Sequence, residues 1–231
     1  GRVLLFSDNP EYVSEPGIMY RDTVEGKARL YLYHATRGQR VMRYSIVVRN
    51  HGERPVNVTI TRKGIGGPSS AYPTVGQSAL ERFWNRLYDE RRVVGPGEQA
   101  HLDPDLVYLA APDGSLVHAI YDIETDGPLE IAFVADDDFF RFLEPNLDLY
   151  EDMVRPVGER MRGTFPTSER YISLRVGDRP VSFSFAGNQP PDLYLWGTDG
   201  VDGSPRQNYG NYGVTYHIDV LMEVTEPRRI R

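Results

Sequence analysis

Alternation of apolar and polar residues with a period of two runs through most of this chain and limits the folds it can adopt. In RYSIVVRNHGERPVNVTITR, apolar side chains alternate with polar or smaller ones over residues 44 to 48, and the alternation resumes over residues 56 to 60. Successive side chains of a strand point to opposite faces, so this period is typical of half-buried strands. The segment predicts a β-hairpin that turns at residues 50 to 54.

Similar patterns predict further strands, separated by turn signals such as Pro-Asp-Gly and Thr-Asp-Gly-Pro. The last pattern places Val214, Tyr216 and Ile218 on one face and polar residues on the other, as in a half-buried antiparallel strand. Many strands at short spacing predict an all-β fold, an antiparallel β-sandwich of the jelly-roll or Ig-like kind. The additional predicted strands are residues 28–35, 105–111, 116–123, 128–135, 170–176, 180–186 and 213–223.

One amphipathic helix is expected to interrupt the strands near residues 78–92. Ser78 and Glu81 match the S-x-x-E capping signature. Apolar residues follow at helical spacing, which predicts a single buried stripe. These residues are Leu80, Phe83, Trp84, Leu87 and Tyr88. A second helical patch is expected within residues 136–154, interrupted by Pro145.

The N-terminus is expected to form an arm, residues 1–20, ahead of a single domain that spans residues 21–231. The arm contains a short apolar strand, and Asn9-Pro10 and Pro16-Gly17 after it favour an extended connector. Such a strand either belongs to its own sheet or adds to the edge of a neighbouring copy. The predicted assembly strand consists of Val3, Leu4, Leu5 and Phe6.

Composition excludes several classes of function. A net charge of -7 argues against binding a nucleic-acid backbone, which requires a positive surface. The chain has no cysteine, so thiolate metal sites and thiol nucleophiles are excluded. No apolar run approaches the roughly 20 residues that cross a bilayer. The chain begins at Gly1 without a signal peptide, which is typical of a mature or excised segment.

Five stretches carry a resemblance to a known group of proteins: LLFSDNPEYVSEPG, GKARLYLYH, ITRKGIGGPS, RGTFPTSER and NYGNYGVTYHI. Together they resemble an uncharacterised secreted domain of Gram-positive bacteria, found in proteins labelled "copper amine oxidase N-terminal domain-containing". The resemblance spans most of the chain and implies export and an extracellular or cell-surface location, but no activity. Copper amine oxidases convert a tyrosine in Asn-Tyr-Asp/Glu to a quinone beside a His-x-His copper site. Here glycine follows both Tyr209 and Tyr212, and His-x-His is absent.

Other catalytic patterns are also absent from the sequence. There is no G-x-S-x-G elbow and no His-Glu-x-x-His helix. The five histidines are scattered through predicted strands and turns, which does not suggest a copper site. Lys63 precedes the glycines of RKGIGGPSS, the wrong order for a phosphate-binding loop, so a flexible strand exit is expected there. The sequence therefore predicts no enzyme and no required cofactor.

Calcium is the one metal whose binding the sequence does not exclude. Asp199 and Asp202 in GTDGVDGSP are the candidate ligands, because calcium takes six to eight oxygens from carboxylates and carbonyls. The competing interpretation is a solvated Asp-Gly turn. The three consecutive aspartates at residues 136 to 138 form a second acidic loop that could hold calcium. The competing interpretation is that they begin a helix, where acidic residues are favoured.

The aromatic stretches PDLYLWGTDG and QNYGNYG contain the candidate ligand-binding residues Trp196, Asn208, Tyr209 and Tyr212. Aromatic faces stack on sugar rings while Asp and Asn bind hydroxyls, so these residues could line a glycan site. Alternatively, they pack an edge of the fold, and Asn-Tyr-Gly turns the chain into the last strand.

The sequence thus predicts a non-enzymatic, extracellular structural domain that assembles into a filament by β-strand addition. Its expected partners are further copies of itself or a cell-wall glycan. The alternative function is a carbohydrate-binding module that uses the aromatic loops.

Overall fold

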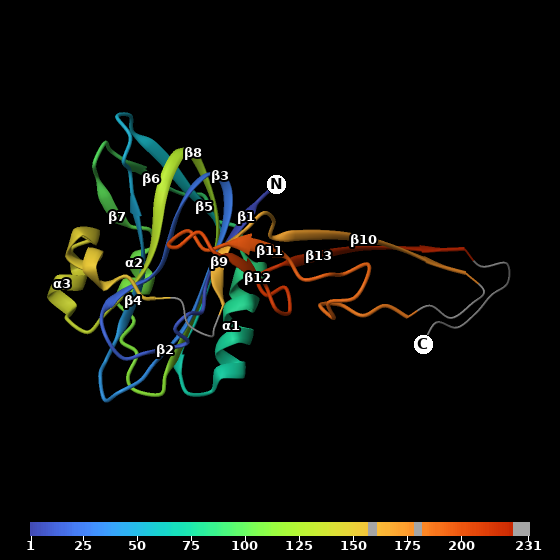
Figure 1. Ribbon diagram of the computed structural model, residues 1–231, viewed down its shortest axis with the longest axis horizontal. Helices are drawn as coiled ribbons and strands as arrows, with labels where there is room; N and C mark the ends of the chain where they lie inside the picture. Colours follow the sequence, from blue (N-terminus) through green and yellow to red (C-terminus); the bar gives the residue numbers. More distant parts are fainter. Residues whose placement is uncertain (157–160, 178–181, 224–231) are drawn as a thin grey trace.

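The computed structural model describes residues 1–156, 161–177 and 182–223. Most of the chain is β-structure, and eleven of the described strands form one mixed sheet (Figure 1). The helical segments are α1 (Tyr72–Asn85), α2 (Pro104–Val107), α3 (Phe139–Leu143) and the 3-10 helix η1 (Leu147–Met153). The strands are β1 (Val3–Ser7), β2 (Tyr12–Val13), β3 (Gly17–Thr36), β4 (Arg43–Arg49), β5 (Val56–Ser69), β6 (Glu90–Val94), β7 (Gln99–His101), β8 (Leu116–Asp136), β9 (Arg162–Phe165), β10 (Glu169–Val176), β11 (Trp196–Thr198), β12 (Pro205–Gln207) and β13 (Thr215–Met222).

Two long antiparallel strands, β3 and β8, organise the sheet. They pair from Gly17 opposite Ala135 to Ala35 opposite Leu116, with irregularities at residues 18–20 and 24–26. The predicted strands 116–123 and 128–135 are therefore one strand, and Thr-Asp-Gly-Pro between them is not a hairpin turn. Because the described strands of the body form one continuous sheet, a two-sheet sandwich or jelly roll is not confirmed.

The predicted hairpin of residues 44 to 60 is wrong, although both of its strands exist. Strand β4 pairs with the second half of β8 and β5 with the first half, both antiparallel. The two strands thus follow one another along the same edge of β8. Residues 50 to 54 connect β4 to β5 without forming a hairpin turn, because both strands pair with β8 and not with each other.

The predicted strand 105–111 is also wrong, because it begins with helix α2. Asp103 caps this helix, and Pro104 occupies its first turn. Of the predicted strand 180–186, residues 180 and 181 lie outside the described part, and residues 182 to 186 form no strand. The helical patch expected within residues 136–154 is confirmed as α3 and η1, with Pro145 between them.

Helix α1 begins and ends earlier than predicted. It spans Tyr72–Asn85, with Pro73 in its first turn, whereas residues 90 to 94 form β6. The expected capping box does not form, because Ser78 lies inside the helix and donates a hydrogen bond to the carbonyl oxygen of Val75. Val75, Ala79 and Phe83 are buried, whereas Leu80, Trp84 and Leu87 of the predicted stripe are exposed.

Glycines of β5 let α1 approach the sheet closely. A Cβ atom at Gly64 would lie 2.0 Å from the carbonyl oxygen of Ala79, and one at Gly66 would lie 2.1 Å from that of Val75. RKGIGGPSS is therefore a helix-packing surface within β5, and the flexible strand exit expected here is wrong. In the main core, apolar residues of β3, β4, β5 and β8 pack together.

Strands β10 and β13 leave the body as a separate two-stranded parallel ribbon, hereafter the ribbon arm (Figure 1). The two strands pair in register from Glu169 opposite Thr215 to Val176 opposite Met222. The prediction of a half-buried antiparallel strand at residues 213–223 is wrong, because residues 217 to 222 are all exposed and the partner strand is parallel.

Candidate functional site

The predicted assembly strand lies inside the sheet of its own chain. Strand β1 pairs in parallel with β3 and antiparallel with β9. Leu4, Leu5 and Phe6 are buried, and Val3 is partly buried. Pairing within its own sheet was the alternative to exchange of the strand between copies. A β1 strand held between β3 and β9 of the same chain is not available at the surface for a partner.

The two Asn-Tyr-Gly triplets form tight turns, as the sequence predicts. Asn208 is buried, and its side chain bonds both the amide nitrogen and the carbonyl oxygen of Tyr212 at 2.9 Å. Asn211 is also buried, with φ at 49°, and accepts a hydrogen bond from the Leu195 amide at 2.8 Å. The asparagines therefore hold the loop, whereas Tyr209 and Tyr212 point outward, 65% and 59% exposed.

Of the four aromatic-loop candidates, only Tyr212 lines a cavity of the described structure. Tyr212 lines a cavity of about 220 Å³ together with residues of β1, β3 and the segment between β1 and β2. Trp196 and Tyr209 are not among the residues that line it, although both are exposed. Asn208 is buried beneath the loop and hydrogen-bonds the backbone of Tyr212. The full set of lining residues is Phe6, Asp8, Glu11, Tyr31, Tyr33 and Tyr212.

The calcium candidates face arginines. The buried carboxylate of Asp199 lies 2.7 Å from Nε of Arg162, which is itself 1% exposed, and 3.7 Å from Nε of Arg206. Asp202 accepts hydrogen bonds from Ser204 and lies 3.7 Å from Arg206. These guanidinium groups neutralise the charge that calcium needs, which favours the interpretation of a structural turn. Within the described residues, no group of three or more His, Asp or Glu side chains is arranged to hold a metal ion.

Two of the three adjacent aspartates, Asp136 and Asp138, have structural roles. Asp138 caps α3 by accepting hydrogen bonds from the amides of Phe140 and Arg141. Asp136 is buried and bonds Arg141 and Tyr150. Although burial opposes it, the contacts with Arg141 and Tyr150 lower the pKa of Asp136. This confirms the helix N-terminus as the role of Asp138.

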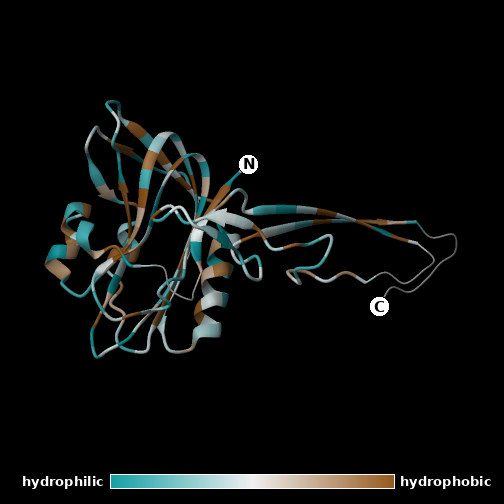
Figure 2. Ribbon diagram, viewed as in Figure 1, coloured by the Kyte–Doolittle hydropathy of each residue, from teal (hydrophilic) through white to brown (hydrophobic). Residues whose placement is uncertain are grey.

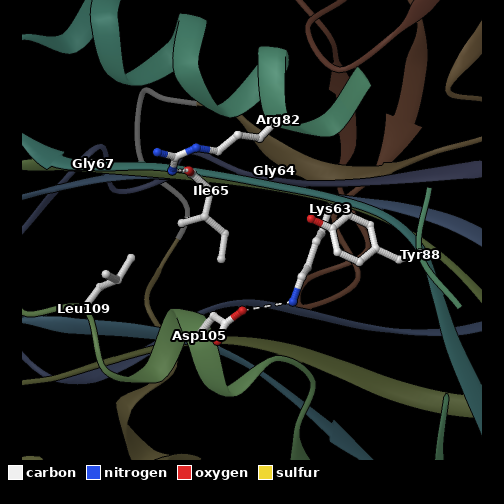
Figure 3. A pocket seen from close by; sticks show the side chains of 8 residues that line it. All are labelled: Lys63, Gly64, Ile65, Gly67, Arg82, Tyr88, Asp105 and Leu109. Carbon is white, nitrogen blue, oxygen red and sulfur yellow. Dashed lines mark hydrogen bonds and ion pairs between the residues drawn. The ribbon is translucent and has the colours of Figure 1, made fainter. Parts of the chain in front are cut away.

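A polar cavity of about 260 Å³ that the sequence did not point to surrounds Lys63 (Figure 3). The ammonium nitrogen of Lys63 lies 3.1 Å from Glu90, 3.1 Å from Asp105 and 3.3 Å from Asp103. Burial opposes its charge, but the bond to Asp105 and the charges of Asp103 and Glu90 raise the pKa of Lys63. The ion pairs therefore favour the charged form of Lys63, whereas a nucleophilic lysine requires a lowered pKa. The role of Lys63 is to neutralise three carboxylates.

The ribbon arm has two different faces. Because side chains alternate along a strand and the two strands pair in register, six aliphatic residues lie side by side on one face. We name this surface the aliphatic face. The other face is mixed: it carries Tyr171, Ser173, Arg175, His217, Asp219 and Leu221. Figure 2 shows hydrophobic residues in the distal part of the arm. The aliphatic face consists of Ile172, Leu174, Val176, Ile218, Val220 and Met222.

Buried groups at its base fix the ribbon arm to the body. Arg29 bonds both oxygens of Asp122, at 2.8 and 3.0 Å, and donates to the carbonyl oxygen of Gly213 and the hydroxyl of Thr215. Buried Asp192 lies 3.1 Å from Arg170 and accepts a 2.9 Å hydrogen bond from Tyr216. The strands therefore leave the body in a defined direction.

Comparisons with known proteins gave no match: no family model, no curated protein and no solved structure matches this chain. None of the described helices is long and apolar enough to cross a lipid bilayer.

Proposed function

We propose that this chain is a non-enzymatic structural domain that associates with further copies of itself through the ribbon arm. The observation that supports this proposal is that no described residue fully covers the aliphatic face, although Ile172, Leu174 and Val176 of β10 are half-buried. The β13 residues Ile218, Val220 and Met222 are 42%, 49% and 55% exposed. Contiguous exposed apolar surface on a soluble protein is typical of an interaction site.

The geometry of the ribbon arm supports the same conclusion. A two-stranded ribbon is marginally stable alone in water, and parallel strands are normally covered on both faces. The arm nevertheless has eight residues in each strand and a rigid base. A long, directed strand pair whose apolar face is at most partly covered by the described residues is best explained by a partner that packs on it.

The partner that fits this face is the same face of a second copy. Between Ile172–Ile218 and Val176–Met222, the last pair of the described strands, the aliphatic face carries no charged side chain, so two copies can meet there without burying an unpaired charge. Its centre is the pair Leu174 and Val220. A two-fold axis near this pair would place each face on the other, an isologous contact.

The expected strength of this contact follows from its size. Strands of eight residues are roughly 26 Å long and about 4.8 Å apart, so stacking two arms buries on the order of 500 Å². Stable interfaces bury roughly 1,200 to 2,000 Å². Arm pairing alone is therefore weak and concentration-dependent. Strand addition at the outer edges of β10 and β13 would enlarge the assembly into a filament. The proposal retains the extracellular location that the sequence resemblance implies.

The first test adds the same charge to opposite faces of the arm. Val220→Lys places an ammonium group on the aliphatic face, whereas Ser173→Lys places one on the other face, beside Asp219. We expect sedimentation velocity to show concentration-dependent association for the wild type and for Ser173→Lys, and loss of association for Val220→Lys. A wild type that stays monomeric at its solubility limit would refute the proposal, as would equal association of both variants.

Cysteine cross-linking maps the contact, because the chain has no natural cysteine. Val220→Cys lies at the centre of the aliphatic face and is expected to form a disulfide-linked dimer under mild oxidation. Ser173→Cys, from the opposite face, is the matched control and is expected to remain largely monomeric. Preferential cross-linking of Ser173→Cys would show that the other face mediates association.

A further inference from the structure

The cavity beside Tyr212 forms part of a longer groove. Tyr31 and Tyr212 line both this cavity and a second one of about 470 Å³ that continues along α1. Trp84 and Leu80 of α1 line the second cavity and are 48% and 43% exposed. One open groove therefore runs from the N-terminal segment past Tyr212 to α1, with aromatic rings along its length. We name it the Tyr212 groove.

The walls of the Tyr212 groove are held in place by packing. The rings of Phe6 and Tyr31 stack with their centroids 4.4 Å apart and 11° between their planes. The Tyr212 loop lies directly over them, because a Cβ atom at Gly213 would come within 3.3 Å of the Tyr31 ring. Asn208 fixes the backbone of Tyr212 on both sides. The aromatic surfaces are thus positioned before any ligand arrives, which reduces the entropy cost of binding.

Polar groups gather at one end of the Tyr212 groove. Burial, and then the charge of Asp8, raise the pKa of the Tyr31 phenol. Asp8, Glu11, Tyr31 and Tyr33 line the same cavity, and burial together with the charges of Asp8 and Glu11 raises the pKa of Tyr33. A carboxylate offers about four lone-pair positions, so it can accept a bond from a ligand hydroxyl in addition to its other contacts.

We propose that the Tyr212 groove binds a neutral oligosaccharide. Flat aromatic faces pack against the C–H surface of a sugar ring, and phenols with carboxylates satisfy its hydroxyl groups. The six side chains of the first cavity include two carboxylates and no cation, and Arg29, which lines the second cavity, is already paired with Asp122; both disfavour a phosphorylated or sulfated ligand. Its volume of about 220 Å³ is below the roughly 300 to 1,000 Å³ of drug-sized sites, so it takes one ring. Further rings extend across Tyr212 toward Trp84.

The chain provides a matched pair of tyrosines for the test. Tyr209 and Tyr212 occupy equivalent places in the two Asn-Tyr-Gly triplets and are similarly exposed, but only Tyr212 lines the groove. The experiment is calorimetric titration of the full chain with cellotriose and chitotriose, followed by the same titrations of Tyr212→Ala and Tyr209→Ala.

We expect heat of binding for at least one trisaccharide and about tenfold weaker binding by Tyr212→Ala, because loss of the ring removes both stacking and buried area. Tyr209→Ala is expected to bind like the wild type. Circular dichroism melts confirm that both variants fold. Absence of heat with both sugars would overturn the proposal. So would equal weakening in the two variants, which would indicate a site elsewhere on the loop.

Discussion

Deletion of residues 1 to 7 is expected to produce a chain that does not fold. These residues supply β1, which lies between β3 and β9 inside the sheet. Leu4 and Leu5 are 0% exposed and Phe6 is 2% exposed. Truncating a single buried Leu or Phe costs about 2 to 5 kcal/mol. The deletion removes three such side chains and two strand ladders, whereas a whole domain is stable by about 5 to 15 kcal/mol.

Far-ultraviolet circular dichroism and thermal melting measure this effect. The deletion variant is expected to lose its cooperative transition, whereas Leu5→Ala is expected to keep it at a lower midpoint. Removal of Gly1 alone is the matched control, because a Cβ atom built on Gly1 has no neighbour within 4 Å. A deletion variant that still melts cooperatively but no longer self-associates would instead show that the N-terminal strand is exchanged between copies.

The sequence predicts strands and turns well where they depend only on residues close together in the chain. Alternation at residues 44 to 48 and 56 to 60 identified β4 and β5, and Asn-Tyr-Gly identified the turns of the Tyr212 loop. Strand pairing is not local, so the hairpin between β4 and β5 was wrong. Both strands pair with β8, which begins more than forty residues after the end of β5 in the chain. Only tertiary contacts distinguish these arrangements.

The boundaries of α1 show a similar limit. Helical spacing identified the helix, but its predicted apolar stripe was displaced. Gly64 and Gly66 admit the side of α1 that carries Val75 and Ala79, and therefore Leu80 and Trp84 remain outside. The small residues of β5 were the sequence signal for this packing, and it could be recognised only with β5 and α1 placed together.

Only part of the cavity beside the Tyr212 loop could be recognised from the sequence. Tyr212 was identified from its loop, but its neighbours Phe6 and Tyr31 come from β1 and β3, which no spacing rule connects to residue 212. Alternation in β13 also predicted one apolar face. It could not show that this face is uncovered, because alternation records which side chains share a face and not what packs on it.

Stability is expected to fall as the pH decreases from about 6.5 to about 4. His34 and His118 are both buried, and burial lowers the pKa of each to about 4. In the unfolded chain a histidine has a pKa of about 6.5, so between these values the unfolded state binds more protons. The stabilisation is complete above pH 6.5 and is lost as the pH falls toward 4. Each histidine accounts for about 3 kcal/mol, from the difference of about 2.5 in pKa at 1.36 kcal/mol per unit.

His118 allows this loss to be assigned to one residue. Among the described residues neither of its ring nitrogens has a hydrogen-bond partner, and its ring packs against Tyr31 and Tyr33. Leucine can fill this space without a titrating group, at a cost of less than about 1.5 kcal/mol if the packing is kept. Urea unfolding is therefore expected to give similar stabilities for the wild type and His118→Leu at pH 8. At pH 4.5 the variant should be the more stable of the two, because the wild type must keep His118 neutral against protonation of the unfolded chain. Parallel pH profiles for the two proteins would mean that His118 is solvated in the folded state.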